Sequence, residues 1–186
     1  MTGRRLPRLG AAVLLLAALD GLAADAKVSA ARSTLSAVFT QMNVPVEAPF
    51  KQFSGSVDFD PTRPAQARAH LDIDTASFDL GDEDYNSEVR KPAWLDTAHY
   101  PRAGFEATGL KPLGGNRYEA SGTLKLKGKD QNLTATVTVG KDGAATVFDG
   151  SVPISRGHFG IGDAQWQDTV ADQVTVKFHI VVPPPR

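Results

Sequence analysis

The stretch that most constrains the fold of this chain runs from Tyr118 to Gly128 and reads YEASGTLKLKG. Apolar and small residues occupy one parity of this stretch, and polar or charged residues occupy the other. Because successive side chains of a strand point to opposite faces, the stretch predicts a strand with one dry face and one wet face. Such strands are typical of antiparallel sheets and barrels. Gly122, in the middle, suits a bend or the close approach of another group.

The same alternation recurs along the rest of the chain. It is found in residues 35–40, 53–59, 67–74, 102–108, 132–140, 148–154 and 174–182. The 17 glycines and 12 prolines favour many short elements over a few long helices. Two prolines in residues 43–49 mark a turn or a sheet edge. The sequence therefore predicts an all-β, antiparallel fold of about eight strands, either an up-and-down barrel or a sandwich.

One segment breaks this pattern. Residues 82–91, DEDYNSEVRK, begin with acids and end with bases, as the helix dipole favours, and Pro92 follows them. We expect one short helix here, set among strands. We interpret it as a lid over the open end of the barrel or sandwich.

The N-terminal residues have the features of a signal peptide. Arg4, Arg5 and Arg8 precede an apolar run at residues 11–19, which is shorter than the roughly 20 residues that a membrane-spanning helix needs. Small residues follow and end at Ala26. We predict a signal peptide over residues 1–26, a retained membrane anchor being the alternative. Residues 27–186 then form one domain, in the periplasm or secreted.

Composition and motifs exclude several classes of function. A net charge of -1 gives no argument for nucleic acid or an anionic membrane as partner. The chain has no cysteine, and its four histidines lack the paired spacing of a zinc site. We find no nucleophile elbow, phosphate-binding glycine loop or catalytic triad. The sequence therefore predicts no catalytic residue, no metal ligand and no cofactor.

The inward positions raise the question of what fills the interior. A barrel of about eight strands can be filled by its own side chains or can hold one small ligand. Small residues at inward positions leave room for a ligand: Ala67, Ala69, Ala120, Gly122, Ala135 and Gly150. Phenylalanine and leucine side chains from facing strands could equally fill that room. The alternation alone therefore fits both a filled interior and an interior that holds a ligand.

A family resemblance is carried by four stretches in order: FSGSVDFDP, WLDTAHYPRAGFEA, the run Gly122-Thr123-Leu124 before Lys127-Gly128, and ISRGHFGIG. These residues resemble the YceI family of exported, lipocalin-like polyisoprenoid-binding proteins, from about residue 33 to residue 182. The resemblance implies an antiparallel lipocalin-like barrel of about eight strands, with a short helical cap and a long apolar tunnel. Ala37, Asn43 and Ala48 depart from the family pattern at the wall and mouth of that tunnel.

The resemblance also implies a ligand and possible partners. The ligand would be a polyprenyl-tailed amphiphile, such as an isoprenoid quinone or a polyprenyl phosphate. Some relatives are joined to or encoded beside inner-membrane b-type cytochromes, and a homodimer is a further possibility. The predicted ligand-binding residues are Phe39, Leu71, Ile73, Phe105, Leu124, Leu126, Val137, Phe148 and Phe178 in the wall, with Trp94, Phe159 and Trp166 nearer the cap and mouth.

Three functions remain to be weighed. The first is a non-enzymatic periplasmic protein that carries or stores an isoprenoid lipid. The second is an envelope interaction module with a filled barrel, which docks a membrane cytochrome or another partner. The third is a hydrolase or isomerase acting on a lipid through acids such as Asp82 or Asp168. We expect the first, without enzymatic activity.

Overall fold

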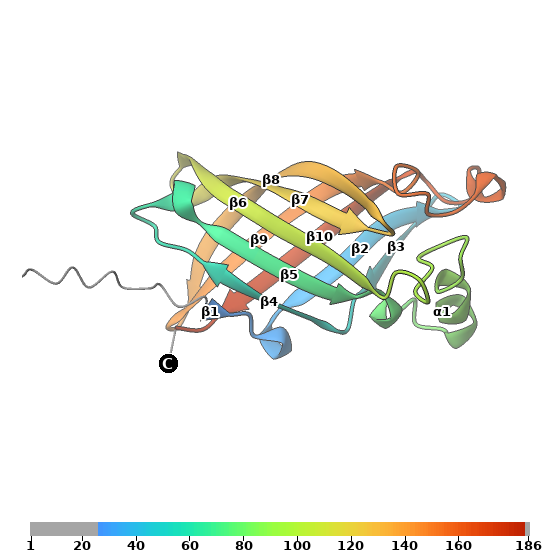
Figure 1. Ribbon diagram of the computed structural model, residues 1–186, viewed down its shortest axis with the longest axis horizontal. Coiled ribbons are helices and arrows are strands. Elements are labelled where there is room, and N and C mark those ends of the chain that lie inside the picture. The colour runs from blue at the N-terminus through green and yellow to red at the C-terminus, as the bar shows by residue number, and fades with distance from the viewer. Residues whose placement is uncertain (1–25, 185–186) are drawn as a thin grey trace, which may run out of the picture.

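The computed structural model describes residues 26–184, so residues 1–25 of the predicted signal peptide lie outside the described range. Ten antiparallel strands form one strongly curled sheet, in the order β1-β4-β5-β6-β7-β8-β9-β10-β2-β3 (Figure 1). The strands are β1 (Ala26–Lys27), β2 (Thr34–Gln41), β3 (Val44–Pro49), β4 (Phe53–Asp58), β5 (Arg68–Asp74), β6 (Arg102–Gly114), β7 (Arg117–Leu126), β8 (Lys129–Asp142), β9 (Ala145–Ser155) and β10 (Gln173–Val182). One α-helix and four short 3-10 turns complete the fold: α1 (Glu83–Val89), η1 (Ala30–Arg32), η2 (Pro64–Gln66), η3 (Thr75–Ser77) and η4 (Ala164–Trp166).

The mostly β, antiparallel fold confirms the prediction, but the strand count and the closure differ from it. β1 has only two residues, too few to show an alternation. β3 occupies the proline-rich segment and is an edge strand. Within residues 26–184 no ladder joins the edge strands β1 and β3. The sheet is therefore a half-barrel of ten strands, rather than the closed barrel of about eight that we expected.

The gap between the two edges is crossed by single hydrogen bonds and turns. Pro45 and Pro49 have no N–H to give to a neighbouring strand, which limits pairing along β3. The Asp79 N–H donates to the Pro49 carbonyl over 3.0 Å on the side of the cap. At the opposite end, the Ser29 N–H donates to the Val181 carbonyl over 2.8 Å. These contacts hold the curled sheet together where strand pairing stops.

Helix α1 confirms the predicted short helix. Its N-cap is Asp82, whose carboxylate accepts a hydrogen bond from the Asp84 N–H over 2.9 Å. The buried Asn86 fixes the helix to the preceding turn, because its side-chain oxygen accepts from the Leu80 N–H over 2.7 Å. In Figure 1, α1 lies at the same end of the curled sheet as the loop between β9 and β10. Together they form the cap.

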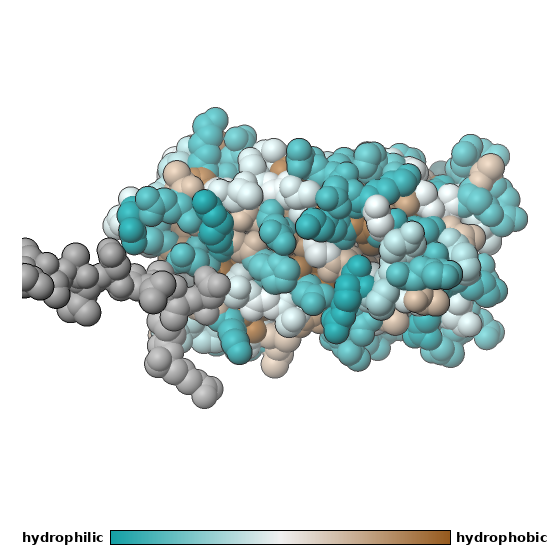
Figure 2. All heavy atoms as spheres, in the orientation of Figure 1, coloured by the Kyte–Doolittle hydropathy of each residue, from teal (hydrophilic) through white to brown (hydrophobic). Residues whose placement is uncertain are grey.

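The outer face of the sheet is polar. Figure 2 shows mainly hydrophilic residues on the visible face, with hydrophobic ones in the gaps between them. His70 and His179 point outward and lie 3.7 Å and 2.6 Å from the carboxylates of Glu106 and Asp149. None of the helices in residues 26–184 combines the length and apolar character needed to cross a bilayer.

Candidate functional site

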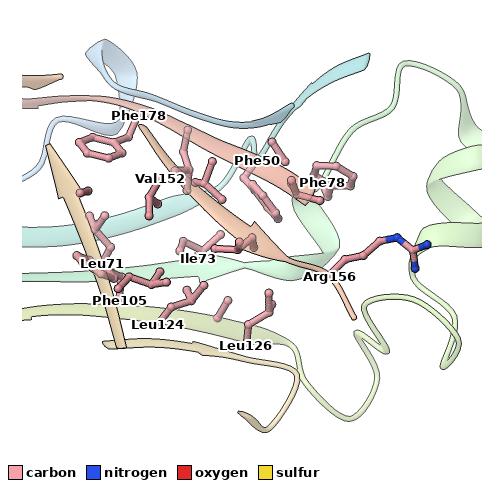
Figure 3. Close-up of a pocket in the computed structure, with 18 of the residues that line it drawn as sticks. Phe50, Leu71, Ile73, Phe78, Phe105, Leu124, Leu126, Val152, Arg156 and Phe178 are labelled. Atoms are coloured by element: carbon pink, nitrogen blue, oxygen red, sulfur yellow. The ribbon is translucent and has the colours of Figure 1, made fainter. Parts of the chain in front are cut away.

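The inner face of the sheet encloses a cavity of about 520 Å³. Cavities of roughly 300–1,000 Å³ are the size at which proteins hold one small organic ligand. Figure 3 shows that apolar side chains from several strands converge on this space. Strands β2 and β5 to β10 supply most of the wall, and α1 and the cap loops supply one end.

Three inward glycines explain why large side chains line this space instead of filling it. Each lies beneath a large side chain of a neighbouring strand: Gly55 beneath Leu71, Gly122 beneath Phe105, and Gly150 beneath Phe178. A Cβ at Gly122 or Gly150 would lie only 2.5 Å from the ring of Phe105 or Phe178. It would also lie 2.5 Å or 2.8 Å from a backbone oxygen of the adjacent strand. The rings can therefore lie flat against the wall only because these positions have no side chain.

An aromatic cluster closes the end of the cavity remote from the cap. The ring of Phe59 packs edge-on against Phe148 and Tyr118, with centroids 5.4 Å and 5.7 Å away. Phe59 follows β4, and Tyr118 lies near the start of β7, both at the end of the sheet opposite α1 (Figure 1). This aromatic cluster is therefore the floor of the cavity, and the cap lies at the opposite end.

The cap end carries the two tryptophans of the chain. Trp94 and Trp166 both line the cavity, and their ring centroids are 5.2 Å apart. Both indole nitrogens are buried, and neither N–H has an acceptor among the described residues. A buried donor without a partner costs about 1–3 kcal/mol. The two indole N–H groups are therefore hydrogen-bond donors to which the described residues offer no acceptor.

Arg156 is a functional residue that the sequence reasoning missed. It continues the inward parity of β9 after Val152 and Ile154, and a charged residue at an inward position is the signal that could have revealed it. Its side chain is buried, and its guanidinium donates to the carbonyls of Ile161 and Val170 over 2.8 Å and 2.7 Å. In Figure 3 the guanidinium points away from the apolar side chains. Arg156 therefore organises the β9–β10 loop that closes the cavity.

Eleven of the twelve predicted ligand-binding residues line the cavity: Phe39, Leu71, Ile73, Trp94, Phe105, Leu124, Leu126, Val137, Phe148, Trp166 and Phe178. Phe159 does not. It is 1% exposed and packs in the core, because the turn that begins at Arg156 holds its backbone through an N–H···O bond of 3.2 Å. Phe50 and Phe78 also line the cavity but were not predicted, since neither lies in an alternating segment.

The acids considered as catalytic candidates lie outside the cavity lining. Asp82 caps α1, and Asp168 is exposed in the β9–β10 loop. Hydrogen bonds from the hydroxyl and backbone N–H of Thr62 lower the pKa of Asp60 to about 2, in a surface loop. In residues 26–184 no three His, Asp or Glu side chains are grouped so that they could hold a metal ion. The cavity itself is thus suited to binding an apolar molecule by contact.

Comparisons with known structures agree with this geometry. The crystal structure of BcnA from Burkholderia cenocepacia is 47% identical with a TM-score of 0.81, and the match covers 83% of this chain and 99% of BcnA. A polyisoprenoid binding domain from Saccharophagus degradans, implicated in plant cell wall breakdown, is 19% identical with a TM-score of 0.72. That match covers 87% of this chain and 99% of the domain, and at this identity it supports the fold alone.

Comparisons with curated sequences point the same way. A UPF0312 protein of Azotobacter vinelandii is 30% identical over 118 residues, covering 60% of this chain and 62% of that protein. The Protein YceI of Escherichia coli O157:H7 is 33% identical over 85 residues, covering 46% and 44%. The chain thus spans less than two thirds of the length of these curated relatives. The YceI-like domain pattern matches residues 27–182, nearly the whole described range, and the chain belongs to the YceI-like domain family.

Proposed function

We propose that the protein binds a polyisoprenoid amphiphile, an isoprenoid quinone or a polyprenyl phosphate, without catalysing a reaction on it. The observation that carries this proposal is the hollow, apolar interior of about 520 Å³. A prenyl tail has no polar groups, so its binding depends on apolar area, at about 25 cal/mol per Å² removed from water. The polyisoprenoid binding domain of Saccharophagus degradans shares the fold, and the ligand class in its name is the one that we propose for this protein.

In this proposal the tail lies along the inner face of a lipocalin-like half-barrel. Leu71, Phe105 and Phe178 are held against the wall above their glycines and offer flat apolar surface to the tail. Phe148 and the floor behind it limit how far the tail can enter. The headgroup then lies at the cap, near Trp94.

We place this binding protein in the periplasm, exported by the predicted signal peptide of residues 1–26, where it carries or stores its lipid between membranes. Cell fractionation of the native host tests the location directly. Detection of the protein only in the cytoplasmic fraction contradicts it.

A partner that receives the ligand is the second part of the proposal. Met42 and Val44, at the tip of the β2–β3 hairpin, are 72% and 60% exposed, next to the cavity-lining Gln41. An exposed apolar tip beside the β9–β10 loop of the cap favours docking against an inner-membrane protein such as a b-type cytochrome, or against a second copy of the chain. A hollow interior favours ligand binding over an interaction module with a filled barrel.

The test of the binding function is organic extraction of protein purified from the native envelope, followed by mass spectrometry. We expect a prenyl-chain compound at about one molecule per chain. The Ala135→Phe variant, which fills the cavity from β8, should yield an empty extract. The Thr134→Phe variant places the same side chain on the exposed face of the same strand and should extract like the wild type. Empty wild-type extracts, with no uptake of added prenyl lipid, contradict the proposal.

A further inference from the structure

One side of helix α1 lines the cavity. Tyr85, Glu88 and Val89 lie three and four positions apart on the helix, and all three belong to the cavity lining. Asp84 and Ser87, which lie between and beside them in the sequence, do not line it. Residues three and four apart are neighbours on one side of a helix, whereas residues two apart are not. The side of α1 that carries Tyr85 therefore faces the cavity.

Along this side of α1, exposure to solvent increases toward the start of the helix. The exposed fraction rises from 9% for Val89 to 39% for the Glu88 side chain and 61% for Tyr85. Val89 thus lies in the closed part of the cavity wall. A residue that lines a cavity and is also largely exposed lies where the cavity meets solvent. The cavity therefore reaches the surface beside the first turn of α1.

Other parts of the cap are fastened to each other by hydrogen bonds. The Lys127 ammonium donates to the carbonyls of Pro92 and Gly160 over 2.8 Å and 2.7 Å, and so joins the segment after α1 to the β9–β10 loop. The β2–β3 hairpin is joined to the same loop, because the Met42 N–H donates to the Thr169 carbonyl over 2.7 Å. An opening at either place would break these hydrogen bonds.

Two of the residues that line the cavity are exposed, Tyr85 and Arg68. Arg68 lies at the start of β5, and its guanidinium is held by the carbonyls of Ala67 and Thr108 over 2.8 Å and 2.7 Å. Tyr85 is held through its backbone N–H, which donates to the Asp82 carboxylate over 3.3 Å, whereas its hydroxyl has no hydrogen-bond partner in residues 26–184. The Tyr85 ring can therefore turn aside without breaking a hydrogen bond.

We propose that the entrance of the cavity lies beside the first turn of α1, and that Tyr85 is its gate: the amphiphile passes the Tyr85 ring when it enters and when it leaves. A tyrosine suits this position, because its ring is apolar and its hydroxyl is polar. A gate obstructs entry and exit alike, so its removal should raise both rate constants and leave the Kd nearly unchanged. This inference rests on the proposed function and adds the route by which the ligand is exchanged.

Exchange rates of ubiquinone-2, a quinone with a short prenyl tail, test the gate. Stopped-flow tryptophan fluorescence follows its uptake, because Trp94 and Trp166 line the cavity. We expect Tyr85→Ala to raise the association and dissociation rate constants by at least about threefold and to keep the Kd within about twofold. Ser87→Ala, a change at an exposed position of the same helix outside the lining, is the matched control and should behave like the wild type. Unchanged rate constants in Tyr85→Ala would overturn the inference.

A reversible block at the entrance gives the second measurement. The chain has no cysteine, so Tyr85→Cys and Ser87→Cys each introduce a single thiol, to which glutathione can be joined as a mixed disulfide. We expect the glutathione at position 85 to slow the uptake of ubiquinone-2 about tenfold, and its removal with dithiothreitol to restore the rate. The same group at position 87 should leave uptake unchanged. Arg68→Cys tests the other exposed part of the lining: slower uptake with glutathione there, and none at position 85, would refute the proposed entrance.

The outcomes separate this inference from the proposed function. If the wild type takes up ubiquinone-2 at rates that neither Tyr85→Ala nor the glutathione at position 85 changes, the gate is refuted and the lipid-binding function stands. A large loss of affinity in Tyr85→Ala, with an unchanged association rate constant, would make Tyr85 a part of the binding wall and also refute the gate. If the wild type shows no saturable uptake of ubiquinone-2, the proposed function fails, and the gate fails with it.

Discussion

At the scale of single residues, the hollow interior depends on glycines as much as on large side chains. Gly122 lies in the alternating stretch from Tyr118 to Gly128. From the sequence, a glycine at this position suits either a bend or the close approach of another group. The structure places the Phe105 ring over it. The sequence could not show this, because the contact joins β7 to a residue of β6 that is not its direct partner in the register.

The first prediction concerns Gly150. In Gly150→Ala the new methyl group meets the Phe178 ring at 2.5 Å and pushes it into the cavity. We expect a loss of about 1–3 kcal/mol in the free energy of unfolding, measured with urea, together with weaker binding of a prenyl probe. Gly140→Ala is the control, since a Cβ at that strand position meets nothing within 4 Å. Equal stability of the two variants would contradict the account of the wall.

The second prediction concerns Arg156. Arg156→Met leaves the carbonyls of Ile161 and Val170 without their donor, in a buried setting. We expect a loss of at least about 3 kcal/mol in the free energy of unfolding. Arg63→Met, which removes an exposed ion pair with Asp60, should cost less than about 1 kcal/mol. Hydrogen exchange locates the effect, and unchanged protection of residues 161–171 in Arg156→Met would contradict the role of this side chain.

At the scale of elements, the cap is attached to the sheet through Asp79. Its carboxylate accepts from the Asn86 amide over 2.8 Å and from the Gly81 N–H over 3.0 Å, and it pairs with the Lys51 ammonium. The Lys51 ammonium, followed by the Asn86 amide, holds the pKa of Asp79 well below its usual value of 3.8. An acid with a lower pKa in the folded state contributes its full stability above its unfolded pKa. That contribution declines as the pH falls below the unfolded pKa and is gone once the pH has fallen through the folded pKa.

The third prediction is therefore a release of the cap in acid. We expect tryptophan fluorescence, which reports on Trp94 and Trp166 in the cap, to change as the pH falls below about 4. In Asp79→Asn this change should become shallower, and the cap should be less stable at pH 7. Asp60→Asn is the control, because Asp60 lies in the loop between β4 and β5. A wild-type acid transition that Asp79→Asn leaves unchanged would contradict this attachment.

The alternation predicted most of the long strands, because their residues face a dry interior and water in turn. The alternation did not predict the features that depend on contacts between residues distant in the sequence. β1 is defined by two residue pairs with β4, and β6 contains a register shift between Ala107 and Gly109 that moves the inward parity on to Leu110. Phe50 and Phe78 face the cavity from segments without regular alternation. Local patterns cannot indicate such positions.

At the scale of the whole molecule, the sheet is a half-barrel with the cap at one end (Figure 1). The aromatic cluster around Phe59 forms the floor at the other end. Alternation alone left a filled and a hollow interior equally open, and only the family resemblance implied a tunnel. Whether the interior is filled or hollow depends on how the small and large residues of seven strands lie against each other. No single stretch of the sequence contains that information.

The fourth prediction follows from the enclosed shape. A prenyl ligand that binds only the folded protein should raise its stability by about 2.7 kcal/mol at a free concentration one hundred times the Kd. Thermal unfolding of wild type, with and without the ligand, measures the effect. The increase should persist in Thr134→Phe and disappear in Ala135→Phe. A similar increase in both variants would place binding outside the cavity.

The central claim is that the cavity binds one prenyl tail through apolar contact. Calorimetric titration of the wild-type protein with a prenyl-chain ligand at several temperatures tests it most directly. Because burial of apolar surface lowers the heat capacity, we predict one site per chain with a clearly negative heat-capacity change of binding, absent in Ala135→Phe. No saturable binding, or binding whose heat-capacity change survives in Ala135→Phe, would contradict the claim.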